Sequence, residues 1–140
     1  MSIHDEISAL RDVPPFAMLD ESKLKLLAFV SQLLNYKAGS VILKQGEVGE
    51  SAYVLMDGLI DVSIADDDGT SSSHEMGKHT FFGEIAITKN TTRAATVTAN
   101  TDIVALKISK DALFDLIAEE PDLATRISDH IEQSGYQITK

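Results

Sequence analysis

The sequence contains no cysteine, only three prolines and about half as many basic as acidic residues. The absence of cysteine excludes disulfides, thiolate metal sites and cysteine-ligated iron–sulfur clusters. No apolar run approaches the length of a membrane span, and the first residues lack the basic flank and apolar core of a secretory signal. We therefore expect a cytoplasmic protein that does not enter a membrane.

The shortage of positive charge also narrows the choice of partners. Twelve lysines and arginines stand against 22 acidic residues, which gives a formal net charge of −10 at pH 7. Proteins that bind nucleic acid neutralise phosphates and carry a clustered basic surface. We expect no direct binding of nucleic acid. A small phosphate ligand stays compatible with this charge if one buried arginine and several main-chain N–H groups set the local field.

Length and composition are those of one globular domain. A chain of 140 residues with 44% hydrophobic side chains can bury a core without metals or disulfides. The pattern predicts helices at both ends and short strands between them, which is typical of an α+β fold. We divide the chain into a helical entry over residues 1–35, an antiparallel β-roll over 36–108, with the character of a jelly-roll-like barrel, and carboxy-terminal helices over 109–138.

The helical segments follow from apolar spacing and capping residues. A short helix is predicted over residues 3–12, and the two prolines that follow end it. Asp20 or Ser22 is expected to cap a second helix that reaches Leu34, and Ser109 is expected to cap a third. Leu123 begins the apolar stripe of a last helix.

Short β-branched runs alternate with glycine and asparagine turns through the middle of the chain, which indicates an antiparallel roll. The predicted strands are residues 41–43, 53–55, 59–64, 95–99 and 103–108. The acidic and serine-rich segment 66–73 is expected to form a solvated hairpin tip.

Residues 82–87, Phe-Gly-Glu-Ile-Ala-Ile, and residues 93–97, Arg-Ala-Ala-Thr-Val, form the motif with the most chemical content. Gly83 lets the backbone turn and approach a ligand closely. A short helical turn after it would direct free N–H groups at an anion, and Arg93 would add a planar fork suited to phosphate. Glu84 would repel a phosphate, but it can accept hydrogen bonds from a sugar hydroxyl.

Simpler interpretations of these residues stay open at this point. Glu84 and Arg93 alone would be read as a structural ion pair, and Phe81 and Phe82 are expected to pack in the core. The acidic run 66–68 lacks the spacing and the final acid of a calcium loop. The four histidines are dispersed and lack the spacing of metal ligands, so we expect no metal site. No motif of a catalytic nucleophile or of a nucleotide hydrolase is present, so we expect a binding module and no enzyme.

The motif resembles the phosphate-binding cassette of the cyclic nucleotide-binding domains, the sensor modules of cyclic-AMP-dependent kinase regulatory subunits, nucleotide-gated channels and catabolite-activator-type transcription factors. Here the cassette spans residues 82–97. Further similarities extend the resemblance over residues 14–138: the helical entry from Phe16, the first roll strands at 36–47 and the hairpin at 52–62. The histidines leave heme as a minor alternative ligand, since some transcription-factor relatives sense heme.

The resemblance implies a role for each cassette residue. Glu84 would accept the ribose 2′-hydroxyl and Arg93 would hold the cyclic phosphate. Gly83, Ile85 and Ala86 would add main-chain contacts. Ala94 follows the arginine where many guanine-preferring relatives have threonine, which favours cyclic AMP over cyclic GMP. Candidates for a lid over the base are Ile131, Tyr136, Ile138 and Thr139.

Two functions follow from this resemblance. The first is a cyclic nucleotide sensor, stand-alone or excised from a longer protein, that signals to an unknown protein effector by moving its carboxy-terminal helix. The second is an interaction or scaffold domain that keeps the roll but does not bind nucleotide physiologically. The intact cassette favours the first. The last apolar stripe is too short for a long coiled coil, so we expect a monomer.

Overall fold

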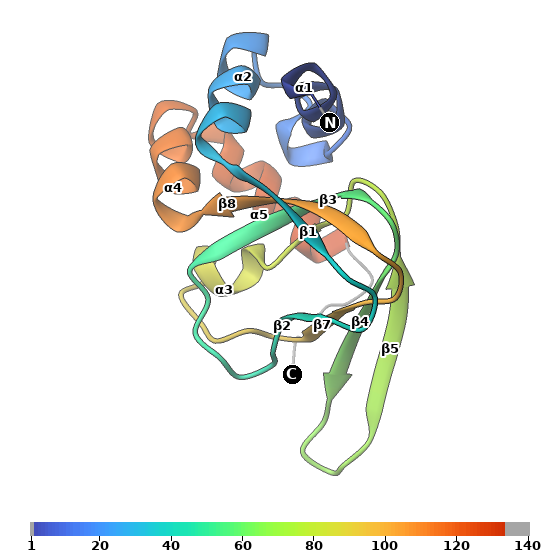
Figure 1. The fold of residues 1–140 in the computed structure, drawn as a ribbon. Coiled ribbons are helices and arrows are strands. Elements are labelled where there is room, and N and C mark those ends of the chain that lie inside the picture. Colours follow the sequence, from blue (N-terminus) through green and yellow to red (C-terminus); the bar gives the residue numbers. More distant parts are fainter. Residues whose placement is uncertain (1, 134–140) are drawn as a thin grey trace.

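Helices occupy both ends of the computed structural model, which describes residues 2–133, and strands occupy its middle (Figure 1). The helical elements are α1 (Ile3–Arg11), the 3-10 turn η1 (Pro14–Phe16), α2 (Glu21–Val30), α3 (Glu84–Thr88), α4 (Lys110–Glu119) and α5 (Asp122–Gln133). The strands are β1 (Gln32–Tyr36), β2 (Val41–Leu43), β3 (Ser51–Asp57), β4 (Ile60–Ala65), β5 (Ser71–Met76), β6 (Phe81–Phe82), β7 (Thr96–Ala99) and β8 (Ile103–Ser109). The predicted α+β order is therefore confirmed.

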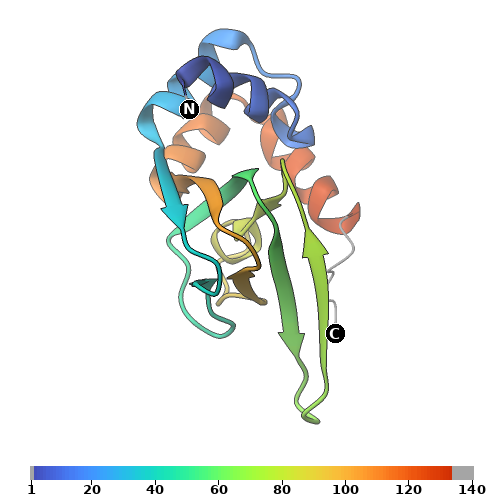
Figure 2. The same cartoon turned by 45° about the vertical axis from the view of Figure 1, so that its right-hand side comes forward.

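The strands form two antiparallel sheets of four. One sheet has the order β1-β8-β3-β6 and the other has the order β2-β7-β4-β5. The predicted antiparallel roll is confirmed, although the two sheets do not close into a single barrel. Figures 1 and 2 show the β4–β5 hairpin extending from the roll at the end opposite to the helices.

The sheet that contains β3 and β8 is buried on both faces. On β3, Ala52 and Val54 belong to the core shared with the helices, whereas Tyr53 and Leu55 point into the roll. This explains why the apolar residues of β3 are continuous rather than alternating. Figure 1 shows α1, α2, α4 and α5 gathered over this sheet, while α3 lies beside the roll.

The two predicted helix caps have different outcomes. The Ser109 hydroxyl accepts a hydrogen bond from the Ala112 N–H and begins α4. Asp20 occupies the cap position of α2, but its side chain makes no capping hydrogen bond.

Three strand assignments differ from the prediction. The second helix ends at Val30 instead of Leu34, because residues 32–36 pair with β8 as strand β1. The serines at 71–73 belong to strand β5, and the exposed turn is shorter than the predicted 66–73. Phe81 and Phe82 form the two-residue strand β6 against β3, and both are buried, as expected of packing residues.

Candidate functional site

The site begins where β6 ends. Phe82 stacks on Tyr53 of β3, with ring centroids 5.2 Å apart, and fixes the position of the next residue, Gly83. Gly83 has φ +83°, the left-handed conformation that glycine adopts without strain. A Cβ at Gly83 would also lie only 2.9 Å from Nη1 of Arg93. Glycine is therefore required here both by conformation and by space, as the sequence predicted.

A short helix follows this glycine and carries the acidic residue of the site. Gly83 occupies the cap position of α3, and Glu84 is its first residue. The Thr88 hydroxyl donates to the Glu84 carbonyl at 2.7 Å, which closes the single turn. Asn90 then adopts φ +53°, a left-handed conformation that asparagine tolerates, and the chain turns back toward Arg93. The predicted helical turn after Gly83 is confirmed.

The backbone of Arg93 is held by the loop between β2 and β3. Its N–H donates to the Glu47 carbonyl at 2.7 Å, and its carbonyl accepts from the Gly46 N–H at 2.9 Å. Val48 and Thr92 form an isolated antiparallel bridge beside these bonds. The loop thus fixes where the arginine side chain leaves the main chain.

The Arg93 side chain is only 7% exposed and binds two main-chain carbonyls. Nη1 donates to the Gly83 carbonyl at 2.8 Å, and Nη2 donates to the Ser51 carbonyl at 2.9 Å. Burial lowers the pKa of Arg93 from its ordinary value, and the nearby Tyr53, Glu50 and Glu84 side chains act in the opposite direction. A guanidinium stays charged in such a setting. The result is a buried cation whose orientation is fixed.

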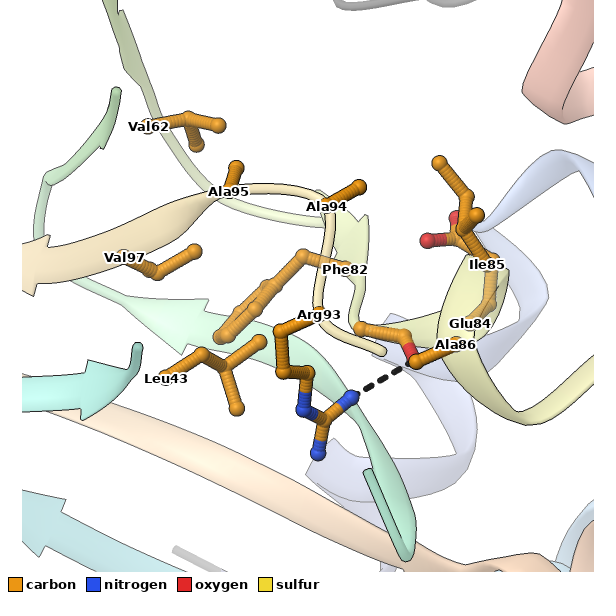
Figure 3. Close-up of a pocket in the computed structure, with 11 residues that line it drawn as sticks. Leu43, Val62, Phe82, Glu84, Ile85, Ala86, Arg93, Ala94, Ala95 and Val97 are labelled. Carbon is orange, nitrogen blue, oxygen red and sulfur yellow. Dashed lines mark hydrogen bonds between the residues drawn. The ribbon is translucent and has the colours of Figure 1, made fainter. Parts of the chain in front are cut away.

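Glu84 lies close to this cation and is fully buried. Figure 3 shows its carboxylate beside Ile85, on the side of α3 that faces Ala94. The Arg93 guanidinium instead donates to the Gly83 carbonyl. The Glu84 carboxylate and the Arg93 guanidinium therefore face different parts of the site. Such a separation suits a ligand that carries both an anion and a neutral hydroxyl.

The cassette and the roll enclose a small pocket between them (Figure 3). Its volume is about 20 Å³, room for about one water molecule. The pocket brings together all six predicted binding residues with apolar side chains from four strands. The lining consists of Leu43, Val62, Phe82, Gly83, Glu84, Ile85, Ala86, Arg93, Ala94, Ala95 and Val97.

The predicted lid residues are placed less completely. Ile131 is buried in the core shared with the helices and lines a shallow groove beside Thr88 of α3, outside the pocket. Tyr136, Ile138 and Thr139 lie outside the described residues. Their role as a lid stays a prediction.

Three further residues shape the site and were not predicted from the sequence. Gly49 approaches the guanidinium so closely that a Cβ there would lie 2.7 Å from Cζ of Arg93. Ser51 supplies a carbonyl, and Val62 lines the pocket from β4. Gly49 follows Gly46 by three residues, which indicates a turn, but no local pattern indicates that it faces an arginine more than 40 residues away.

The structure also bears on the simpler interpretations. The described residues contain no group of three or more histidine, aspartate or glutamate side chains placed to hold a metal ion. Among the helices of residues 2–133, none is both long enough and apolar enough to cross a membrane. In the acidic hairpin turn, the Asp68 carboxylate accepts hydrogen bonds from the main chain and hydroxyl of Thr70, which lower its pKa.

The fold thus brings a glycine turn, a buried acid and a buried, oriented arginine together at one edge of an antiparallel roll. The chain belongs to the cyclic nucleotide-binding domain family, whose sequence model matches residues 33–120. The cassette resemblance noted in the sequence is thus confirmed at the level of the family.

Curated relatives include kinase regulatory proteins. A cAMP-dependent protein kinase regulatory subunit from Colletotrichum orbiculare is 32% identical over 108 residues, which are 77% of this chain and 27% of that protein. A cGMP-dependent protein kinase from Toxoplasma gondii is 38% identical over 88 residues, 63% of this chain and 8% of the relative. The chain therefore spans about a quarter or less of these proteins.

Solved structures include a close match to the whole fold. A mutant regulatory subunit of a cAMP-independent protein kinase A from Trypanosoma brucei, with cAMP bound in its A site, superposes with a TM-score of 0.83. It is 25% identical, and the match covers 96% of this chain and 48% of the other. The ligand in that mutant protein is cAMP.

Proposed function

We propose that this chain binds a cyclic nucleotide and reports its presence to a protein effector. The observation that carries the proposal is the buried Arg93 fork, held beside Gly83 and within the same pocket as Glu84. Arg93 would bind the cyclic phosphate bidentately, and Glu84 would accept the ribose 2′-hydroxyl. Gly83, Ile85 and Ala86 would bring main-chain groups to the phosphate.

Cyclic AMP is the proposed ligand in preference to cyclic GMP. Ala94 lines the pocket directly after the arginine and has no hydroxyl with which to hold guanine. Relatives of both kinds exist, a cAMP-dependent regulatory subunit and a cGMP-dependent kinase, so family membership alone does not make this choice. The argument for cyclic AMP rests on the missing hydroxyl at Ala94.

Ligand binding is proposed to be coupled to movement. The space of about 20 Å³ between the cassette and the roll is far smaller than a nucleotide, which favours a shift of the cassette when the ligand enters. The groove formed by Thr88 of α3 and Ile127 and Ile131 of α5 lies behind the cassette. A displacement of α3 would change its contacts with α5 across this groove. If α5 has two positions, a ligand that moves α3 can shift the balance between them.

The proposed role is regulatory and not enzymatic. The family consists of ligand-binding regulatory domains, and the pocket holds one acid and one arginine without a nucleophile or a second carboxylate. The effector is not identified by these residues. The cytoplasmic location and the monomeric state expected from the sequence stay predictions.

Calorimetric titration with cyclic AMP and cyclic GMP tests the proposal. Wild type is expected to bind cyclic AMP more tightly than cyclic GMP. Arg93→Ala should weaken cyclic AMP binding by roughly 2–5 kcal/mol, the range for removing one partner of a buried charged contact. That is about thirtyfold to several thousandfold in Kd. Arg93→Lys should restore little, since a point charge does not reproduce the fork.

Arg11→Ala is the matched control, because Arg11 is exposed and pairs only at the surface with Glu21, 3.6 Å away. Thermal unfolding of each variant shows whether a loss of binding reflects loss of the fold. A wild type that binds no better than a folded Arg93→Ala variant would overturn the sensor and support a scaffold domain.

A further inference from the structure

Tyr53 interacts with residues at both places where a main-chain carbonyl holds the Arg93 guanidinium. Arg93 is held by two main-chain carbonyls, those of Gly83 and Ser51, which come from segments more than 30 residues apart. Tyr53 lies on β3, is only 5% exposed and points into the roll between them. Its ring packs against Phe82, the residue before Gly83, and its hydroxyl accepts a hydrogen bond from the side chain of Ser51.

The first support is reached through an aromatic stack. Tyr53 pairs with Phe82 across the β3–β6 ladder, and their rings stack at 5.2 Å with planes 11° apart. Phe82 is 1% exposed and directly precedes Gly83. Stacked buried rings restrict each other's position, so the stack fixes where the Gly83 carbonyl meets Nη1.

The second support is reached through a hydroxyl. The Ser51 hydroxyl donates to the Tyr53 hydroxyl at 3.5 Å, a long hydrogen bond inside the buried roll. The carbonyl of Ser51 accepts from Nη2 of Arg93 at 2.9 Å. A buried serine needs a partner, since an unsatisfied hydroxyl costs free energy. Tyr53 provides that partner and holds the residue whose carbonyl faces the guanidinium.

A second tyrosine extends the network toward β1. Burial, together with the neighbouring Tyr53 side chain, raises the pKa of Tyr36 to about 12. Tyr36 therefore stays neutral at physiological pH. Tyr36, Ser51 and Tyr53 all belong to the same sheet of the roll, which contains β1 and β3.

We propose that Tyr53 is a positioning residue that orients the Arg93 fork toward the ligand through its stack on Phe82 and its hydroxyl contact with Ser51. A phenylalanine would fill the same apolar space without burying a hydroxyl, so apolar packing alone does not explain why this position is a tyrosine. Orienting an arginine before the ligand arrives lowers the entropy lost on binding. This inference rests on the proposed function, in which Arg93 binds the phosphate.

The test uses Tyr53→Phe, which keeps the ring stack and removes only the hydroxyl. The chain has three arginines, so its ¹H–¹⁵N spectrum contains three side-chain Nε–H signals, and Arg93→Lys identifies the one from Arg93. Without ligand, Tyr53→Phe should shift that signal and speed its exchange with water. Tyr53→Phe should also weaken cyclic AMP binding by about threefold to tenfold, the effect expected from the loss of one hydrogen bond.

A double-mutant cycle separates positioning from general stability. In the Arg93→Lys background, Tyr53→Phe should change affinity little, because the fork it orients is gone. Thr98→Val, which removes a half-buried hydroxyl from β7, is the control and should leave both readouts unchanged.

Two results would overturn the inference: an Arg93 signal unchanged by Tyr53→Phe, or equal losses of affinity in both backgrounds. If wild type binds no cyclic nucleotide, the proposed function fails, and the signal of the ligand-free protein still decides whether Tyr53 orients Arg93.

Discussion

Two glycines set the distance between the main chain and the guanidinium of Arg93. Gly83 needs its left-handed φ, whereas Gly49 has no such requirement. What Gly49 contributes is space, because any Cβ there would overlap Arg93 and also lie 2.9 Å from Cβ of Ala86. Such close approach of backbone to a charged side chain is a frequent reason for glycine outside turns.

Gly49→Ala is therefore expected to displace the arginine. We expect the free energy of unfolding to fall by roughly 1–3 kcal/mol, the range for overpacking a buried site, and cyclic AMP affinity to fall as well. Urea unfolding and calorimetry measure the two effects. Gly77→Ala is the matched control, since the nearest atom to its added Cβ lies 3.6 Å away. Equal behaviour of the two variants would contradict this account.

The second residue-level prediction concerns Glu84. Glu84→Gln keeps the shape but makes the acceptor neutral, so cyclic AMP binding should weaken by roughly 1–3 kcal/mol. A 2′-deoxy ligand should lose a similar amount against wild type and little more against the variant. Titrations of both proteins with both ligands complete the cycle. If the losses of affinity from the substitution and from the 2′-deoxy ligand simply add, Glu84 does not bind the 2′-hydroxyl.

Helix α5 connects the cassette to the helical layer. Its buried residues Leu123, Ile127 and Ile131 belong to the core that the helices share with β3 and β8. The helix also carries His130, whose ring lies 6.2 Å from that of Phe81. Phe81 in turn contacts Phe16 of η1 at 5.1 Å. The position of α5 thus depends on an aromatic contact one residue away from the stack that supports the site.

A ligand that shifts α3 should change the stability of α5. We expect residues 122–133 to gain hydrogen-exchange protection when cyclic AMP binds, because α5 covers the groove behind the cassette. Exchange followed by mass spectrometry, with and without ligand, measures this. Residues 3–11 of α1 serve as the internal reference. Protection limited to residues 82–97 would mean that the cassette binds without engaging α5.

Acid should loosen the same helix. Burial lowers the pKa of His130 below its ordinary value of 6.5. As the pH falls below 6.5, this histidine is therefore protonated in the unfolded chain before it is protonated in the folded chain. The stability that neutral His130 contributes is therefore present above pH 6.5 and is lost as the pH falls from there to the folded pKa. Urea unfolding at pH 7.5 and 5.5 should show a larger loss for wild type than for His130→Gln. Identical losses would contradict this assignment.

The charge of the whole chain opposes its proposed ligand. The net charge of −10 repels an anionic nucleotide at long range, while the field of Arg93 acts only within the site. Salt screens the long-range repulsion, since the Debye length is about 10 Å at 0.1 M, more than it screens buried contacts. Binding would then depend on local orientation and not on electrostatic steering.

The association rate of cyclic AMP is accordingly expected to rise with ionic strength. Stopped-flow measurements at low and high sodium chloride test this, and uncharged adenosine provides a reference ligand whose rate should change little. A cyclic AMP rate that falls with salt would instead indicate a steering field from the site.

The sequence alone predicted helices at both ends, a strand-rich middle and the glycine, acid and arginine of the cassette, with a single domain as an expectation. It could do so because these features are local: apolar periodicity, a capping serine at 109, and a glycine followed by an acid and, nine residues later, an arginine. It missed the strand at 71–76, since exposed serines at a sheet edge lack the β-branched pattern of buried strands. The sequence analysis also missed the start of β1, because pairing with β8, which lies far along the chain, determines where this strand begins.

Only the tertiary structure decided what surrounds Arg93. Gly49, Ser51 and Tyr53 lie about 40 residues before the arginine, and they reach it because β3 pairs with β6 and the loop before β3 pairs with the chain at Arg93. No periodicity in the sequence encodes that approach. The chain carries the chemical groups of the cassette in one short segment, but burial, orientation and the carbonyls that hold the guanidinium come from strands distant in sequence, since a charge is stabilised inside a protein only by groups that the fold brings to it.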